Sequence, residues 1–434
     1  MRKLVLLLVM CSILVSIFTS CTSKQEDASN QQPDESKVGQ FILDQGKPTE
    51  LKVWMPPFGT EDSLDKDFWE QQFVQFENDN NVKTSIEITP WAGYEEKYLT
   101  GISSGAGPDV GYMYAEMVAD FINMGALEPF DAYLTEEEKA NYIYLENGKF
   151  QGKQYMLPIV VGNPRILLCN MEILGKSGID KAPQTWDEFV EAGKKVLADS
   201  PDIYPFLQPW GDTNAGGLNA LFFPFVWQAG SQLFNEQETK LMLDSPQAIS
   251  AAQFIYDLRF KHKIMPDTVT SLKNADVENA FLEGKVAMII GTTSYTASRV
   301  EPSGMKWDYS VLKGQKQATF VAMDSLIITS KSNNKELAAK AAKYMTSGSA
   351  MTNFHKNLSK FPPIGRDEEY ADIERFKTLY EDKNIEFNNY PTVAGMFKVV
   401  DVLYKNLQLM MLDQMKPEEV MQDVAKYADT IIGQ

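Results

Sequence analysis

Aromatic and acidic side chains follow two apolar runs of the sequence, at points where a predicted strand would give way to a helix. The first group is Trp54, Phe58 and Glu61, and the second is Tyr112, Tyr114 and Glu116. Aromatic rings can cover the weakly apolar faces of a sugar, and planar polar side chains can each make several hydrogen bonds. These residue types therefore suit a site for a polar solute that carries many hydroxyl groups.

Other chemistries have less support in the sequence. The chain has two histidines, His262 and His355, in separate segments, so a histidine-based metal site or catalytic triad is not expected, and both histidines are expected at the surface. No G-x-S-x-G elbow joins a predicted strand to a helix, and no phosphate-binding glycine loop is present. A glycoside hydrolase needs only a pair of carboxyl groups, and 59 acidic residues leave that alternative open.

The elements that must position these residues alternate between strands and helices. Apolar runs and alternation predict strands at 51–55, 82–89, 109–114, 154–158, 166–169, 286–290 and 326–329. Helical periodicity and end signals predict helices around 69–76, 94–102, 185–196, 245–256, 277–283, 335–346, 399–411 and 417–432. Strands that alternate with helices indicate an α/β protein whose open sheets are largely parallel, and such sheets bind ligands beyond the carboxyl ends of their strands.

The N-terminus reads as an export signal followed by a lipid attachment site. Arg2 and Lys3 precede an apolar run from Leu4 to Phe18, which is shorter than the ~20 residues of a membrane span. Small residues and then Cys21 follow, so residues 1–20 are expected to be a lipoprotein signal peptide and Cys21 the lipidated residue. Residues 21–48 are polar and are expected to form a flexible tether about 29 Å long on average.

Composition gives broad limits on the mature chain. Without Arg2 and Lys3, 39 basic residues face 59 acidic ones, so the net charge is near −20 and nucleic acid is a poor partner. Cys169 is the one cysteine left in the body, which excludes an internal disulfide there. A body of this length is expected to form two or more domains around apolar cores.

Several motifs, in order, resemble those of the family 1 extracellular solute-binding proteins, which are maltose-binding-protein-like receptors of ABC importers. The matching pieces are the strand 51–54, the turn 104–109, the segment 125–131, the pair 152–158 and 168–170, the segment 178–189 and the segment 281–291. In letters the clearest are SGAGPD, GALEPFD, PQTWDEF and FLEGKVAM. The resemblance runs from about residue 50 to the C-terminus.

The resemblance implies a two-lobed periplasmic-binding-protein-like fold of type II, with a ligand cleft between lobes that are joined by crossing strands. One lobe would comprise 49–161 plus 323–371, and the other 162–322 plus 372–434. It also implies a monomeric carbohydrate receptor that is not an enzyme, needs no cofactor or metal, closes by hinge motion and delivers its ligand to ABC permease subunits. The protein would be extracytoplasmic and lipid-anchored to the bacterial cell membrane. A glycan-active hydrolase and a sugar sensor for signalling are the alternatives.

The resemblance also implies further contact residues. Trp210 corresponds to the aromatic platform of the family's inter-lobe loop, and Phe397 to its C-terminal aromatic. The family's aromatic contact after the third strand falls on Met113, which leaves open whether Tyr112 or Tyr114 replaces it. Two positions depart from the pattern: Asn163 stands where the family has an acidic contact, and Thr293 stands where it has an aromatic, with Tyr295 the next aromatic along.

Two charged residues lie near the expected crossings between the lobes. Arg165 could hold a ligand carboxylate with two hydrogen bonds, or it could pair with a neighbouring Asp or Glu, and we favour the second reading. Asp324 begins the strand at the second crossing and could reach the hinge region. Both residues are candidate ligand contacts.

Overall fold

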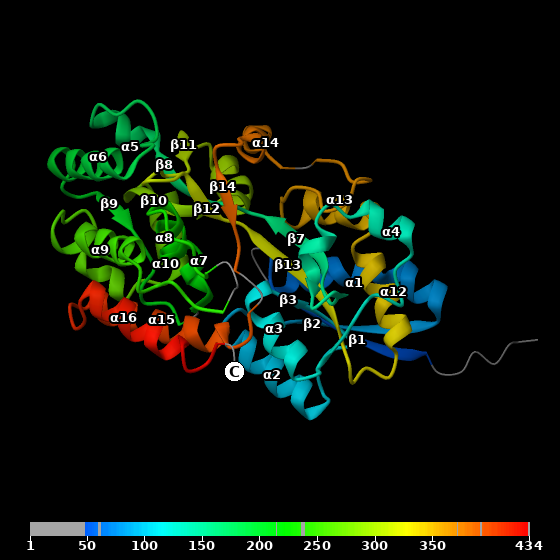
Figure 1. Ribbon diagram of the computed structural model, residues 1–434. Coiled ribbons are helices and arrows are strands. Elements are labelled where there is room, and N and C mark those ends of the chain that lie inside the picture. The colour runs from blue at the N-terminus through cyan, green and yellow to red at the C-terminus, as the bar shows by residue number, and fades with distance from the viewer. Residues whose placement is uncertain are drawn as a thin grey trace, which may run out of the picture. The chain divides into compact units, whose positions relative to one another are not determined.

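The computed structural model describes residues 48–59, 62–213, 215–235, 239–370, 372–390 and 393–432. The expected signal peptide, Cys21 and nearly all of the expected tether lie outside these residues, as does Glu61. Figure 1 shows the arrangement of the elements that follow. In the part of the chain that is described, none of the helices combines the length and the apolar character that crossing a membrane requires.

The first sheet has the strand order β2-β1-β3-β13-β4, and β7 also pairs with β13. Its strands are β1 (Thr49–Met55), β2 (Val82–Ile88), β3 (Val110–Met113), β4 (Leu127–Glu128), β7 (Leu157–Gly162) and β13 (Ala322–Thr329). β1 runs parallel to β2 and β3, as the sequence predicts, whereas β13 is antiparallel to β3, β4 and β7. The carboxyl ends of β1, β2 and β3 therefore share one edge.

The second sheet has the strand order β11-β8-β10-β9. Its strands are β8 (Arg165–Asn170), β9 (Tyr204–Leu207), β10 (Val286–Thr292) and β11 (Trp307–Ser310). β10 is antiparallel to β8 and parallel to β9. Cys169 on β8 is fully buried in this sheet and is a free thiol.

The chain crosses between the sheets where β7 leads into β8. Gly162 and Asn163 both have left-handed backbone angles there, with φ of 96° and 52°. A second crossing joins β12 (Ala318–Phe320) to β13, and β12 pairs in parallel with β14 (Glu386–Asn388). Crossing strands thus join two groups of elements, as expected, but the residue at which each lobe begins and ends stays a prediction.

Helices around the first sheet bury an aromatic core. They are α1 (Asp62–Asn80), α2 (Tyr94–Ser104), α3 (Ala115–Asn123), α12 (Lys335–Met345) and α13 (Gly348–Asn357). Trp69 of α1 is fully buried and stacks on Phe354 of α13, with 5.6 Å between the ring centroids. The sequence predicts α1, α2 and α12, but α3 and α13 were not expected.

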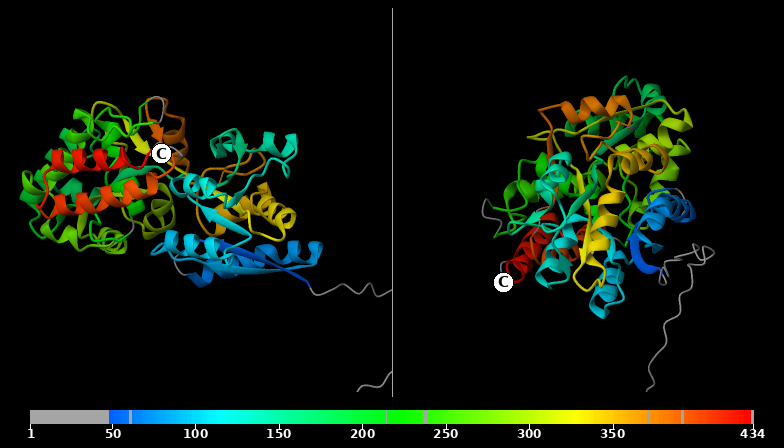
Figure 2. Two further views of the ribbon diagram at one scale, coloured as in Figure 1. Left: turned by 60° about the horizontal axis from the view of Figure 1, so that its bottom comes forward. Right: turned by 90° about the vertical axis from the view of Figure 1, so that its right-hand side faces the viewer.

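Helices around the second sheet include the last two of the chain. They are α5 (Met171–Lys176), α6 (Trp186–Asp199), α7 (Leu218–Leu221), α8 (Phe223–Gln228), α9 (Pro246–Phe260), α10 (Asn274–Leu282), α11 (Thr293–Tyr295), α14 (Glu374–Glu381), α15 (Met396–Met411) and α16 (Pro417–Ala428). α15 and α16 run side by side, and α16 packs on α9 (Figure 2). Thr185 caps α6, and the Glu188 carboxylate accepts from the Gln184 amide.

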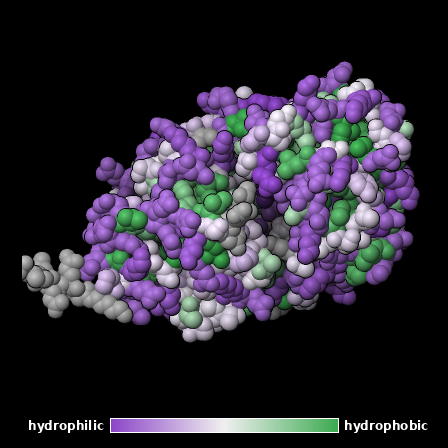
Figure 3. Space-filling model, turned by 180° about the vertical axis from the view of Figure 1, so that it is seen from behind, coloured by the Kyte–Doolittle hydropathy of each residue, from purple (hydrophilic) through white to green (hydrophobic). Residues whose placement is uncertain are grey.

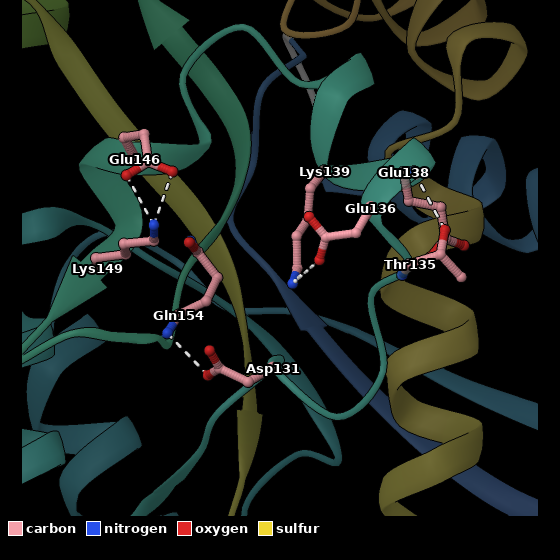
Figure 4. Close-up of polar contacts among 8 residues, drawn as sticks. All are labelled: Asp131, Thr135, Glu136, Glu138, Lys139, Glu146, Lys149 and Gln154. Atoms are coloured by element: carbon pink, nitrogen blue, oxygen red, sulfur yellow. Dashed lines mark hydrogen bonds and ion pairs between the residues drawn. The ribbon is translucent and has the colours of Figure 1, made fainter.

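Short elements close one end of the first sheet (Figure 4). α4 (Glu136–Asn141) starts with a capping box, in which the Thr135 hydroxyl accepts from the Glu138 amide and the Glu138 carboxylate accepts from the Thr135 amide. The Asp131 carboxylate accepts from the Gln154 amide at 2.9 Å and so ties the turn after β4 to β6 (Lys153–Gln154), which pairs with β5 (Lys149–Phe150). These contacts lead the chain into β7 and thus to the first crossing.

Candidate functional site

A cavity of about 910 Å³ is lined by elements that belong to both sheets. From the first sheet and its helices come the turn after β1, one face of α1, the end of β3, the start of α3 and the segment after α13. From the second come α7, α10, α11 and the helical turn 296–300. Both crossings contribute as well. Figure 3 shows that the molecule is hollowed on the face opposite to that of Figure 1, with hydrophilic residues in the hollow.

Eight of the residues that the sequence singles out lie together in this lining. They are Phe58, Tyr112, Tyr114, Glu116, Asn163, Arg165, Tyr295 and Asp324. They come from segments that are up to 266 positions apart, because the parallel strands of the first sheet end at one edge and the crossings pass the same place. Tyr112 and Tyr114 both line the cavity, whereas Met113 between them is fully buried.

Hydrogen bonds fix the acidic side of the cavity. The Tyr112 hydroxyl of β3 donates to the Asp324 carboxylate of β13 at 2.5 Å. The Tyr114 hydroxyl donates to the Glu95 carboxylate of α2. Glu116 lies in the first turn of α3 and is 7 % exposed, with its side chain in the cavity lining. This side therefore offers carboxyl groups whose positions the sheet determines.

Arg165 lies at the start of β8, opposite these carboxyl groups. Its Nε donates to the side-chain oxygen of Asn219 on α7 at 3.0 Å, and its Nη1 donates to the carbonyl oxygen of Asn163 at 2.6 Å. The guanidinium also lies over the ring of Phe320, 4.9 Å from its centroid. Among the described ion pairs none involves Arg165, so the carboxylate partner that we favoured from the sequence is not found. Neutral groups orient this side chain.

Burial changes the acidity of the charged groups in the cavity. It raises the pKa of Asp324 from 3.8 to about 6, although the Tyr112 hydroxyl and the Arg165 charge oppose the shift. Burial, followed by the negative charge of Asp324, raises the pKa of Glu116 well above its usual value. Burial also lowers the pKa of Arg165. The cavity thus combines two carboxyl groups whose pKa values are raised with a guanidinium whose pKa is lowered.

Trp91 is an aromatic wall residue that the sequence analysis missed. It follows β2, lines the cavity and packs against Tyr94, with 5.2 Å between the ring centroids and 33° between the ring planes. Its edge-to-face contact with Tyr112 spans 6.0 Å. The rule that selected Trp54, that an aromatic residue after a parallel strand faces the ligand edge, would have found Trp91 had it been applied to the second strand.

Several expected contact residues lie elsewhere. Trp54 is 7 % exposed and packs edge-to-face on Tyr98, because it is still part of β1 and points into the core. Trp210 is 1 % exposed, with its Nε1 bonded to Gln208 and its ring stacked on Tyr404. Phe397 is half-buried in the first turn of α15 and is not part of the described lining. None of these three residues belongs to the described lining of the cavity, and Glu61 lies outside the described residues; that they contact a ligand stays a prediction.

His355 is fully buried, so its expected surface position is wrong. It lies on α13, and residues 355–361 form one wall of the cavity. His262 is half-exposed after α9. Within the described ranges, no group of three or more His, Cys, Asp or Glu side chains is placed to hold a metal ion.

Comparisons with known proteins agree with this geometry. The sequence profile of the family described as "Bacterial extracellular solute-binding protein" matches residues 59–351. A binding protein of Brucella abortus (strain 2308) is 27 % identical over 380 residues, which are 84 % of this chain and 90 % of that protein. An arabinooligosaccharide-binding protein of Halalkalibacterium halodurans is 27 % identical over 229 residues, 50 % of this chain and 47 % of that protein.

A solved structure of maltose-bound MalE3 from T. maritima superposes with a TM-score of 0.75 at 23 % identity. The superposition covers 88 % of this chain and 99 % of that one. This similarity confirms the α/β fold with two lobes that the sequence analysis predicted.

Proposed function

The chain belongs to the bacterial extracellular solute-binding protein family, and on that premise we propose that it is the lipid-anchored, monomeric receptor of an ABC importer and binds an oligosaccharide in the cavity. Members of this family are extracytoplasmic binding proteins, which favours a receptor over a hydrolase. The single observation that carries the proposal is a cavity of about 910 Å³ whose lining, drawn from both sheets, combines aromatic rings with carboxyl, amide and guanidinium groups.

The chemistry of the lining supports a sugar in particular. A sugar hydroxyl both donates and accepts hydrogen bonds, and the cavity offers acceptors in Asp324, Glu116 and Asn163 and a donor in Arg165. Phe58, Trp91, Tyr114 and Tyr295 supply aromatic surface for the weakly apolar faces of the rings. Relatives named for arabinooligosaccharide and galactooligosaccharide binding support the same ligand class.

The volume supports an oligosaccharide over a monosaccharide. The cavity lies near the upper end of the ~300–1,000 Å³ that is usual for small-molecule sites. Its lining continues from Arg165 at the crossing to Leu64 and Gln71 on α1, so a linear ligand could contact the crossing and the rim at once. We propose that ligand binding draws the two lobes, with the boundaries given above, together at Gly162 and Asn163.

Binding without turnover is the test. The soluble body, from residue 48 onward, is mixed with a panel of oligosaccharides at a hundredfold excess over Kd. A receptor gains ~2.7 kcal/mol of stability from RT ln(1+[L]/Kd), and the sugar is recovered intact. Steady release of shorter sugars would overturn the receptor assignment in favour of a hydrolase, and a panel in which no sugar shifts the unfolding temperature would overturn the ligand class.

The lipid anchor has its own test. Cys21→Ser in the full-length chain should move the mature protein from the membrane fraction to the soluble fraction, because one acylated cysteine is the proposed attachment. Retention of the variant in the membrane fraction would contradict the anchor but leave the ligand proposal intact.

A further inference from the structure

His355, the first residue of the cavity wall formed by residues 355–361, lies against the buried side chain of Glu368, which is not part of the lining. The Nε2 atom of His355 is 3.2 Å from Oε2 of Glu368, and both side chains are fully buried. Oε1 of Glu368 accepts the backbone N–H groups of Ile364 and Gly365 at 2.9 and 2.6 Å. Neither Nε2 of His355 nor Oε2 of Glu368 has a hydrogen-bond partner among the described residues, so the segment from 355 to 368 is held through Oε1 of Glu368 and through the other ring nitrogen of His355.

The second nitrogen of His355 points to the wall itself. Its Nδ1 is 3.3 Å from the carbonyl oxygen of Ser359. A carbonyl oxygen only accepts hydrogen bonds, so Nδ1 carries the proton and Nε2 faces Glu368. The imidazole ring also makes edge-to-face contacts with Phe354 and Phe361, at 5.3 and 6.1 Å. These contacts of His355 fix the position of the Ser359 backbone.

Ser359 in turn meets the opposite side of the cavity. Its hydroxyl is 3.0 Å from the hydroxyl of Ser294 on α11, which follows β10 of the second sheet. The Ser294 amide donates to Oδ1 of Asn163 at 2.9 Å, and the Thr293 hydroxyl donates to the same atom at 3.3 Å. Asn163 is the left-handed residue at the first crossing. A continuous series of polar contacts thus runs from His355 through Ser359 and Ser294 to the crossing.

We propose that His355 is a positioning residue for solute binding, which holds the 355–361 wall so that Ser359 bonds to Ser294 across the cavity. The inference rests on the proposed function, because it gives His355 a role in ligand affinity. The Ser359–Ser294 bridge joins the wall from the first sheet to the helix from the second. Loss of His355 as a donor to Ser359 therefore loosens one side of the cavity relative to the other.

Two substitutions of His355 separate positioning from packing. An Asn side chain places its amide nitrogen near the position of Nδ1 and can still donate to the Ser359 carbonyl, whereas a Gln amide reaches toward Nε2 and Glu368. We expect His355→Gln to weaken oligosaccharide affinity about tenfold more than His355→Asn, since one charged or neutral hydrogen bond changes an equilibrium by about that factor. Equal losses for the two variants would overturn the positioning role, because packing alone does not distinguish them.

A double-mutant cycle tests the bridge. Ser359→Ala and Ser294→Ala should each weaken binding about fivefold, and the double variant should lose no more than either single one, because both remove the same bond. Ser250→Ala, at an exposed site on α9 outside the cavity lining, is the matched control and should leave affinity unchanged. Losses that multiply would mean that each hydroxyl contacts the sugar separately, which contradicts the proposal.

Hydrogen exchange of the ligand-free protein gives a readout that needs no sugar. Ser294→Ala and His355→Gln should both speed the exchange of the amides of residues 357–361, and Ser250→Ala should not. Unchanged exchange in Ser294→Ala would overturn the bridge even if no ligand were found. If instead the wild-type protein binds no sugar but exchange responds as expected, the proposed function fails and the bridge stands.

Discussion

The Tyr112 hydroxyl and the Asp324 carboxylate, on neighbouring antiparallel strands, form a hydrogen bond of 2.5 Å at the floor of the cavity. Tyr112 is 1 % exposed, and its pKa is raised well above 10 by burial, so it stays a donor at all physiological pH values. Asp324 therefore keeps one oxygen on Tyr112, and its other oxygen is available to the cavity that it lines.

Affinity should depend on pH through Asp324. Its carboxylate accepts a sugar hydroxyl more strongly when ionised than when protonated, and its pKa is raised to about 6. We expect the Kd of an oligosaccharide to be constant above about pH 7 and to rise by up to tenfold per pH unit below about pH 6. Isothermal titration between pH 8 and pH 5 measures this. Asp324→Asn should bind more weakly at pH 8 and lose this dependence; a variant that keeps the wild-type profile would assign the titration to another group.

Stability should show the opposite trend through the same residue. Because the folded pKa of about 6 exceeds the unfolded value of 3.8, the folded state binds the proton more tightly. The contribution of Asp324 to the free energy of unfolding is therefore fully present below about pH 4 and is lost as the pH rises through 6. The difference is at most ~3 kcal/mol, and Asp324→Asn should abolish it. Chemical unfolding of ligand-free protein at pH 4.5 and 7.5 measures the change, and a variant that loses stability equally at both values would contradict the assignment.

Replacing Trp91 or Trp210 by alanine should have opposite effects, one mainly on affinity and the other mainly on stability. Trp91→Ala should weaken sugar binding by ~10- to 100-fold with a modest loss of stability, because its ring lines the cavity. Trp210→Ala should cost ~3–5 kcal/mol of folding stability, because its ring is buried, and should leave the affinity of the folded fraction close to wild type. Affinities from calorimetry and midpoints of denaturant unfolding, measured for both variants, test this. A loss of affinity in Trp210→Ala alone would mean that Trp210 contacts the ligand.

A lysine at position 165 should not bind the ligand as well as Arg165 does. The guanidinium bonds to Asn219 and to the Asn163 carbonyl in two directions while it lies over Phe320, a geometry that a single ammonium group cannot reproduce. Arg165→Lys keeps the charge, yet we expect it to weaken binding by about 1.5–3 kcal/mol. The same substitution at the exposed Arg366 is the control. An Arg165→Lys protein with wild-type affinity would mean that the positive charge alone is used.

The first crossing should tolerate substitution poorly. Gly162 has a φ of 96°, and a Cβ added there would lie 2.7 Å from Pro362. Gly178 also has a left-handed φ, of 68°, but nothing lies within 4 Å of its added Cβ. Gly162→Ala should therefore destabilise the protein by about 1–3 kcal/mol more than Gly178→Ala, as thermal unfolding would show. Equal losses of stability in the two variants would mean that Pro362 can move away from the added methyl group at no cost.

Local sequence rules predicted the elements better than they predicted the lining of the cavity. Periodicity places β1, β2 and the helices between the first strands, and an apolar run places β3. The same rules cannot tell which face of a strand end points to the cavity, so Trp54 was expected in the site although β1 directs it into the core. Trp210 lies outside the lining for a related reason, since its ring stacks on Tyr404 of α15.

The buried position of His355 follows from the tertiary structure and could not be predicted from the sequence. A lone histidine in a polar helix is expected at the surface, and nothing near it in the sequence indicates that Glu368, thirteen residues on, returns to its Nε2 atom. The contact depends on the loop after α13, which carries no regular secondary structure. Arg165 and Asp324 are singled out for their places at the crossings, and both line the cavity, because connectivity between lobes constrains where such residues can lie.

The buried thiol of Cys169 makes this protein convenient to convert into an optical sensor. Burial raises the pKa of that thiol well above its usual value and shields it in β8, so a maleimide dye would leave it unmodified. A new cysteine at Leu64, half-exposed on the rim where α1 meets the cavity, would then be the reactive handle within the described chain. A fluorophore attached there would change its emission as the rim loses water on ligand uptake, and it would report cargo in real time without a transport assay.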